Sequence, residues 1–186
     1  TGAMLPVLIL VFGPVSGAHM NPAVSAVLAL RREIAPGEAA AYAGAQVAGG
    51  VAGVLLAHAM FDLPLLQAGG TARAGTGQWI AEAVATAGLI LTVLGVRRAR
   101  PEAVPHAVGL YITGAYWFTA STSFANPAVT LARSFTDTFA GIAPGDVAAF
   151  AAVQLAAAVA AGAAWRWLAE APDTALNRGT RPAAGN

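Results

Sequence analysis

Several residue types are scarce or absent in this sequence, and each absence removes a class of function. Only 10% of the 186 residues are charged, whereas an average soluble domain has about 25%, so the chain cannot cover a water-facing surface with charge. This deficit excludes a disordered protein, a coiled coil and an ordinary cytosolic enzyme. There is no cysteine, which excludes disulfide frameworks, thiolate zinc sites and cysteine nucleophiles.

The few charges that remain are balanced. All ten basic residues are arginines, and nine acidic residues leave a formal net charge of +1. A near-neutral chain has no electrostatic field that would attract nucleic acid. Three histidines without clustered carboxylates, and no glycine-rich phosphate loop, supply no catalytic, metal or cofactor site. The sequence therefore predicts neither an enzyme, nor a nucleic-acid-binding protein, nor a cofactor.

The sequence contains long apolar runs, and hydrophobic residues make up 57% of it. A helix that crosses a bilayer core needs about 20 apolar residues. Four runs hold no acidic or basic residue and a fifth holds only Glu82; they are 1–30, 39–61, 103–132, 147–165 and 77–96. The runs predict an all-α membrane protein. The polar, Pro/Gly-rich stretch 169–186 is expected to be a disordered tail.

Two of these runs are interrupted by an asparagine followed by a proline, at Asn21-Pro22 and at Asn126-Pro127. Asparagine is a strong N-cap, and proline suits the first position of a helix. Each pair therefore predicts a new helix that starts inside the membrane, over about 21–30 and about 126–135. Each is about 15 Å long, which is half of a bilayer.

The two motifs belong to an internal repeat. Asn21-Pro22-Ala23-Val24-Ser25 recurs 105 residues later as Asn126-Pro127-Ala128-Val129-Thr130, and a second match aligns 36–46 with 144–154. A repeat with an odd number of spans inverts its second copy across the membrane. The second copy shows three spans, at 77–97, 103–119 and 145–168, whereas the first shows part of one (1–13) and one complete span (37–61). We therefore expect that one span and part of another precede this sequence in a longer chain.

The arginines predict the orientation. If segment 31–36 is cytoplasmic, eight of the ten arginines fall on the cytoplasmic side, and only Arg73 and Arg133 fall on the other. Positive charge concentrates on the cytoplasmic side of membrane proteins. The C-terminus is accordingly expected in the cytoplasm.

Half-helices that enter from opposite faces bring their N-termini together at mid-depth. Each N-terminus carries roughly half a positive charge, so the pair repels cations and hydronium. The side-chain oxygens of Asn21 and Asn126 can cap the helices while their NH₂ groups donate to a solute. Carbonyl acceptors are expected along the segments before each asparagine, from Gly17, Ala18 and His19 and from Thr122, Ser123 and Phe124. This arrangement suits a neutral, hydrogen-bonding solute.

Residues 16–24 and 123–129 resemble the two signatures of the aquaporin, or major intrinsic protein, family. The resemblance covers about residues 1–168 and rests on Asn21, Pro22 and Ala23 and on Asn126, Pro127 and Ala128. It implies six tilted spans with two half-helices, one pore in each protomer and a homotetramer in the bilayer. Valine after the second motif is similar to bacterial members, which implies a bacterial inner membrane.

The family resemblance also assigns an outer constriction of four residues, Thr1, Gly114, Ser123 and Val129. Relatives usually have arginine where this chain has Val129. Four small, uncharged residues imply a wide and weakly polar constriction, which favours glycerol, urea or metalloid acids such as arsenite over water alone. Arg133 lies one helical turn beyond Val129 on the same face, and the sequence leaves open whether it reaches the pore.

The role of Glu82 distinguishes a passive channel from an ion-coupled transporter. An ion-coupled secondary transporter also uses inverted repeats and broken helices, and it would need a titratable or cation-binding group at mid-depth. Glu82 is the one candidate, but a carboxylate inside a membrane is costly and usually has a partner. We expect Glu82 to be a structural buried acid that accepts hydrogen bonds from half-helix backbone groups. The preferred function is a passive channel for water and small uncharged solutes that excludes protons and cations.

Overall fold

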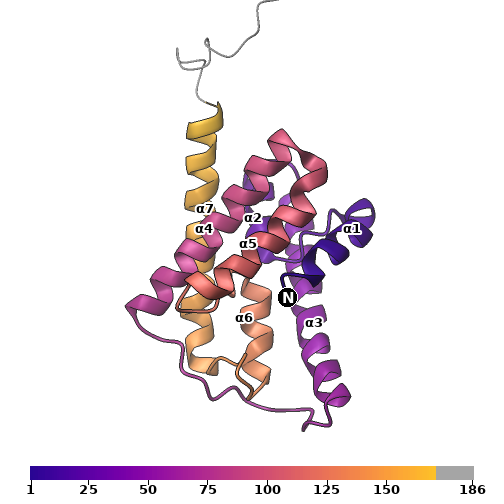
Figure 1. Cartoon of the computed structure of the whole chain (residues 1–186), viewed down its shortest axis with the longest axis vertical. Coiled ribbons are helices and arrows are strands. Elements are labelled where there is room, and N and C mark those ends of the chain that lie inside the picture. The colour runs from indigo at the N-terminus through magenta and orange to yellow at the C-terminus, as the bar shows by residue number, and fades with distance from the viewer. Residues whose placement is uncertain (171–186) are drawn as a thin grey trace, which may run out of the picture.

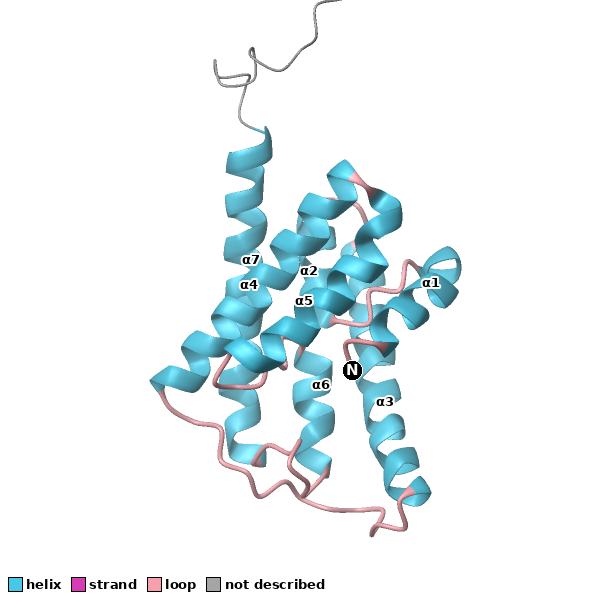
Figure 2. Cartoon of the chain, viewed as in Figure 1, coloured by secondary structure: helices cyan, strands magenta, loops and turns pink. Residues whose placement is uncertain are grey.

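The fold is that of a helical bundle, seen in a computed structural model that describes residues 1–170 (Figure 1). Within those residues the chain forms helices and loops and no strand (Figure 2). The expected disorder of the C-terminal stretch concerns residues 171–186, which lie outside the described part, while 169 and 170 belong to the last helix. The prediction of an all-helical membrane protein is confirmed.

Within residues 1–170, three helices are long and apolar enough to cross a membrane. They are α3 (Pro36–Met60), α4 (Thr76–Ala99) and α7 (Val147–Glu170), the last preceded by the short helix η3 (Pro144–Asp146). Two shorter apolar helices accompany them, α1 (Met4–Ser16) and α5 (Val104–Phe118), the latter preceded by η1 (Pro101–Ala103). These boundaries lie within a few residues of the predicted spans, because prolines and charged loops mark the ends of the apolar runs.

The two half-helices form where the Asn-Pro pairs predicted them. They are α2 (Pro22–Leu30) and α6 (Pro127–Ala132), and α6 continues into the short helix η2 (Arg133–Phe135). Figure 1 shows α2 in the upper half of the bundle and α6 in the lower half, between α3 and α7. The half-helices therefore start near the middle of the bundle and run toward opposite ends.

Small and branched side chains pack the half-helices against the spans. Val27 and Leu28 of α2 join Ile90 and Leu94 of α4 and Ala158 of α7 in one buried cluster. A second buried cluster joins α4 and α5, with Ala125 of the second motif among its members. Close packing through small residues is the usual means of helix association in membranes, where lipid is as apolar as the side chains.

Glycine makes one of these contacts possible. A Cβ atom at Gly109 of α5 would lie 2.5 Å from the ring of Pro6 in α1. Any larger residue would push α1 away from α5. Since both helices carry cavity residues, this glycine sets the distance between two walls of the site described below.

The loops gather at two opposite ends of the bundle. At one end, Arg31 and Glu33 after α2 meet Arg97 near the end of α4. At the other end, loop 61–75 contacts the segment around 134–146, with Thr71 accepting from the backbone of Ala143 and Ser134 accepting from that of Gly69. Large apolar side chains such as Val15, Leu66 and Trp117 are exposed on the outside, as expected for surfaces that face lipid.

Candidate pore and the half-helix tips

The N-termini of the two half-helices are capped in the same way. The Asn21 side-chain oxygen accepts from the backbone of Ala23 at 2.9 Å. The Asn126 oxygen accepts from Ala128 at 3.0 Å and from Val129 at 3.2 Å. Both asparagines have extended backbones, and a proline follows each at the first helical position. Capping by the side-chain oxygen turns both NH₂ groups away from their own helices.

Those NH₂ groups bind across the gap between the tips. The Asn21 amide donates to the carbonyl of Ala125 at 2.7 Å, and the Asn126 amide donates to the carbonyl of Met20 at 2.8 Å. These reciprocal bonds bring residues more than 100 positions apart into direct contact. From the sequence, the NH₂ group of each asparagine was predicted to donate its hydrogen bonds to the solute. The geometry instead uses one hydrogen of each amide to join the tips and leaves one for a solute.

The segments that lead into the asparagines share an unusual backbone. Residues four, three and one positions before Asn21 have positive φ angles, and so do those before Asn126; the six are Gly17, Ala18, Met20, Thr122, Ser123 and Ala125. For residues other than glycine this region costs of order 1–3 kcal/mol each and persists only where the surroundings impose it. The repeat is thus visible in the backbone as well as in the sequence.

A buried carboxylate holds the second segment. Glu82 of α4 has no exposed surface, and its two oxygens accept from the backbone amides of Phe124 and Ala125, each at 2.8 Å. Gln154 of α7 donates to Glu82 at 2.5 Å and to Thr130 at 2.9 Å. The acid therefore binds the half-helix backbone, which is where the sequence argument placed it.

Different side chains support the first segment. Ser25 of α2 contacts Nδ1 of His19 and accepts from the amide of Gln46, each at 3.2 Å. The His19 ring stacks on Tyr42 of α3, whose hydroxyl donates to the carbonyl of Ser16 at 2.6 Å. Gln46 and Gln154 thus bind equivalent hydroxyls in the two copies. Both glutamines lie between helices, and neither is among the residues that line the cavity.

A cavity of about 530 Å³ runs past the meeting point of the tips. Four residues of α5, spaced four apart, mark its length: Val104, Val108, Ile112 and Tyr116. Twelve residues of helix correspond to about 18 Å. Asn21 and Asn126 line the middle, Arg97 lies toward one end, and Thr1 and Arg133 lie with Tyr116 toward the other. We call these the Arg97 end and the Tyr116 end.

The cavity includes most of the residues expected to line a pore, with two exceptions. Gly17, Ala18 and His19 line it, as do Ser123 and Phe124, together with the constriction residues Thr1 and Val129. Gly114 does not: it is exposed on α5 and has no described neighbour within 4 Å of a built Cβ. Thr122 is also absent from the lining. Counting residues back from the second motif placed Gly114 at the constriction, whereas the stripe of α5 that lines the cavity runs through Ile112 and Tyr116.

The Tyr116 end is more polar than four small residues imply. The guanidinium of Arg133 donates to the hydroxyl of Tyr116 at 2.8 Å, and that hydroxyl lies 3.0 Å from the Thr1 hydroxyl. The Arg133 guanidinium also lies 4.2 Å from the centre of the Phe124 ring. The sequence left open whether Arg133 reaches the pore, and the structure places it in the lining of the cavity, so a cation lies one turn beyond the uncharged Val129.

A second arginine, Arg73, shapes this end from outside the cavity lining, and sequence reasoning treated it only as a loop charge. Its buried side chain donates to the carbonyls of Gly141, Ser121 and Phe139, at 2.8 to 3.1 Å. Its guanidinium lies 4.7 Å from the Phe124 ring centre. Burial, and then the charge of Arg133, lower the pKa of Arg73. No local sequence signal marks this role, since it depends on carbonyls from two distant loops.

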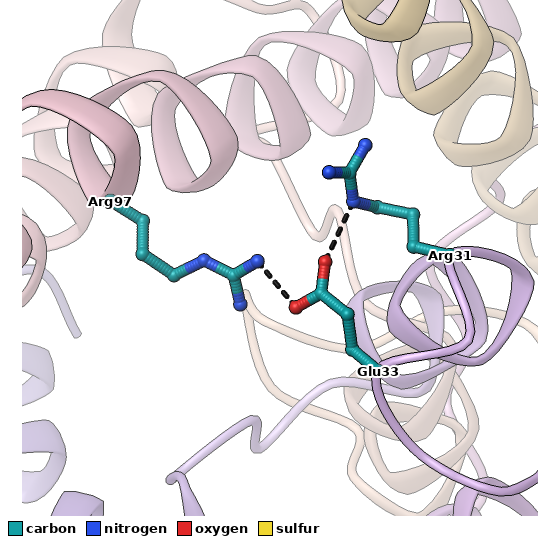
Figure 3. Close-up of polar contacts among 3 residues, drawn as sticks. All are labelled: Arg31, Glu33 and Arg97. Atoms are coloured by element: carbon teal, nitrogen blue, oxygen red, sulfur yellow. Dashed lines mark hydrogen bonds and ion pairs between the residues drawn. The ribbon is translucent and has the colours of Figure 1, made fainter.

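Ion pairs link the ends of two helices at the Arg97 end (Figure 3). Glu33 binds Arg31 through one carboxylate oxygen, at 2.8 Å, and Arg97 through the other. Burial alone would raise the pKa of Glu33, but the hydrogen bonds and charges of the two arginines outweigh it and hold the pKa below its ordinary value of 4.5. The carboxylate is therefore charged at neutral pH, and it links the end of α2 to the end of α4.

Comparison with known proteins gives the same family as the paired motifs. A sequence model described as major intrinsic protein matches residues 1–112. The aquaglyceroporin AqpS of Rhizobium meliloti (strain 1021) is 56% identical over 182 residues, which cover 98% of this chain and 78% of that protein. The probable aquaporins PIP2-8 of Oryza sativa subsp. japonica and of Arabidopsis thaliana are 36% identical over 118 and 114 residues, 41% of each relative. The family model matches more than half of this chain, and a relative aligns with nearly all of it. This chain therefore belongs to the major intrinsic protein family.

Proposed function

We propose that the chain forms a passive channel for water and small uncharged solutes, among them glycerol-like molecules and metalloid acids such as arsenite. The observation that carries the proposal is the cavity itself, which passes both asparagine tips and joins polar groups to an apolar wall of α1 and α5. Similarity to a protein named an aquaglyceroporin supports a solute range wider than water. Membership of a family of channels also supports the expectation that the chain is not an enzyme.

Exclusion of protons and cations follows from the meeting of the tips. Two helix N-termini that face each other in a site of low dielectric raise the energy of any cation between them. The free hydrogen of each asparagine amide donates to a passing water, which must then point its own hydrogens toward the two mouths. A water oriented in this way cannot relay a proton to its neighbours.

Glu82 argues against ion coupling. Its oxygens accept two backbone amides and the amide of Gln154, so the carboxylate is fully engaged in holding the second half-helix. A coupling site would have to release those bonds in each transport cycle. Among the described residues, no group at mid-depth is therefore available to bind the driving ion that an ion-coupled transporter needs.

The protein is an integral membrane protein, and we infer a homotetramer in a bacterial inner membrane with its C-terminus in the cytoplasm. The structure brings Arg31 and Arg97 to the same end of the bundle, which supports a common side for the arginine-rich loops. The positive-inside rule then makes this the cytoplasmic end. Family resemblance is the support for the tetramer.

Flux through liposomes tests the channel proposal. The complete chain is reconstituted, and water, glycerol and arsenite permeabilities are measured after an osmotic or concentration step, with an internal pH dye reporting proton entry. We expect flux that does not saturate, does not depend on an ion gradient and carries no protons. Flux that saturates and stops when the ion gradient collapses would show a coupled transporter instead.

A further inference from the structure

We propose that Arg133 is the specificity-determining cation of this pore and that it donates hydrogen bonds to the hydroxyl groups of small polyols at the Tyr116 end. The inference rests on the proposed channel function and adds the residue that selects among its solutes. Val129 occupies the position at which the family resemblance led us to look for an arginine. Arg133 supplies a guanidinium one helical turn further along the chain.

The backbone explains how Arg133 reaches the cavity. Helix α6 ends at Ala132, and Arg133 is both its C-cap and the first residue of η2. The negative end of a helix dipole favours a cation at this position. Residue 133 follows Val129 by four positions, so the two lie on the same side of the helix, and both line the cavity.

Two contacts hold the guanidinium plane in place. One nitrogen, Nη2, donates to the Tyr116 hydroxyl at 2.8 Å. The face of the group lies 4.2 Å from the centre of the Phe124 ring, within the range of a cation–π contact. A guanidinium has five N–H donors, and within the described residues that of Arg133 makes one hydrogen bond. Donors on a rigid plane therefore remain for a solute in the cavity.

The charge of Arg133 is also uncompensated locally. Among residues 1–170, the ion pairs at the Arg97 end do not involve it, and no carboxylate lies within ion-pair distance of it. The second arginine near Phe124 is turned toward loop carbonyls and does not line the cavity. Arg133 is thus the cation that a solute meets at this end.

The surroundings indicate which solutes it selects. The Tyr116 and Thr1 hydroxyls extend the polar side from Arg133 across the cavity, while Leu5, Ile9 and Ile112 form an apolar side. A small polyol has hydroxyls along one edge and C–H groups along the other, and it can satisfy both sides together. A solute of similar size with fewer hydroxyls leaves guanidinium donors without a partner.

Paired solutes test this directly. Glycerol and 1,2-propanediol have the same carbon skeleton and differ by one hydroxyl, so the ratio of their permeabilities reports hydroxyl recognition with little influence from size. In liposomes with the complete chain, Arg133→Leu keeps bulk and removes the donors. We expect the glycerol to propanediol ratio to fall roughly ten- to a hundredfold, as for loss of one hydrogen bond to a charged group.

Two further variants keep the test decisive. Tyr116→Phe removes one anchor of the guanidinium and should lower the same ratio by a smaller factor, even if Arg133→Leu fails to fold. Arg100→Leu, an exposed arginine outside the cavity lining, should leave the ratio unchanged. Equal losses for glycerol, propanediol and water in the Arg133 and Tyr116 variants would show a structural role and overturn the inference, as would an unchanged ratio. A wild-type chain without any solute flux would instead refute the channel function.

Discussion

The two re-entrant segments have the same backbone but different supports. Both place residues in the left-handed region at the same three positions before the asparagine, and both asparagines cap a half-helix. The second segment binds a fully buried carboxylate, Glu82. The first packs on the half-buried His19 and Tyr42. In each half a buried side-chain oxygen has no hydrogen-bond partner within the described chain, Oε1 of Gln46 in the first and Oγ of Ser123 in the second. A strained backbone can thus be held by a buried charge or by packing.

The largest expected effect is the loss of the buried charge. Glu82→Ala leaves two backbone amides buried without an acceptor and removes one of the two acceptors of the Gln154 amide. Each such group costs about 1–3 kcal/mol, so we expect a loss of several kcal/mol and little folded protein, measured by thermal unfolding in detergent. Glu82→Gln retains one oxygen acceptor and should lose less. A melting temperature equal to that of the wild type for Glu82→Ala would contradict the account of the second segment.

Replacing either tip asparagine by aspartate should come next in size. Asn21→Asp and Asn126→Asp each put an anion in the positive centre and set an oxygen against the carbonyl that the amide now binds. We expect cation conductance across lipid to rise roughly tenfold, which corresponds to a barrier lowered by about 1.4 kcal/mol. Asn21 is the more buried of the two, so its variant should also be the less stable. Conductance that stays at the wild-type level in both variants would disprove the barrier.

The two glutamines offer a matched comparison of the halves. Gln154 is fully buried and bonded to Glu82 and Thr130, whereas Gln46 is half-buried and bonded to Ser25. Gln154→Ala should therefore cost about 1–2 kcal/mol more than Gln46→Ala, as read from the unfolding midpoints of the two variants. Equal midpoints would mean that both halves rely on their glutamine to the same extent.

The smallest effect should come from the ion pairs at the Arg97 end. The folded protein lowers the pKa of Glu33 below 4.5, so its contribution to stability is complete above that value and is lost as the pH falls through the lowered pKa. Between pH 5 and 8 the difference in melting temperature between wild type and Glu33→Gln should stay constant and small, since a partly exposed pair contributes about 0.5 kcal/mol. At lower pH the difference should vanish. A difference that changes between pH 6 and 7 would contradict the lowered pKa.

Most helices could be predicted because their signals are local. Apolar length, charged loops and the Asn-Pro caps located the spans and both half-helices to within a few residues. The repeat then predicted that the two tips meet. The expectation for Glu82 followed from the cost of an unpaired carboxylate in a membrane, which is a property of the residue and its depth rather than of its neighbours.

The details of the cavity could not be predicted in the same way. Gly114 was assigned by counting from the motif, but the direction of a side chain depends on the rotation of α5 about its axis, which the packing of Gly109 against Pro6 helps to set. The crosswise bonds of the asparagine amides depend on carbonyls from the opposite copy. The position of the Arg133 guanidinium depends on Tyr116 of α5 and on Phe124, which contact it from two other segments.

The amino-acid sequence by itself determined the membrane character, the repeat, the half-helices and the family, since these depend on composition and on hydrogen bonding within a few residues. Only the tertiary structure decided which side chains share the cavity, that Arg73 and Arg133 both lie against the Phe124 ring, and that each asparagine donates to the other's segment. Those features depend on the relative rotation and distance of helices far apart in the chain, which no local pattern encodes.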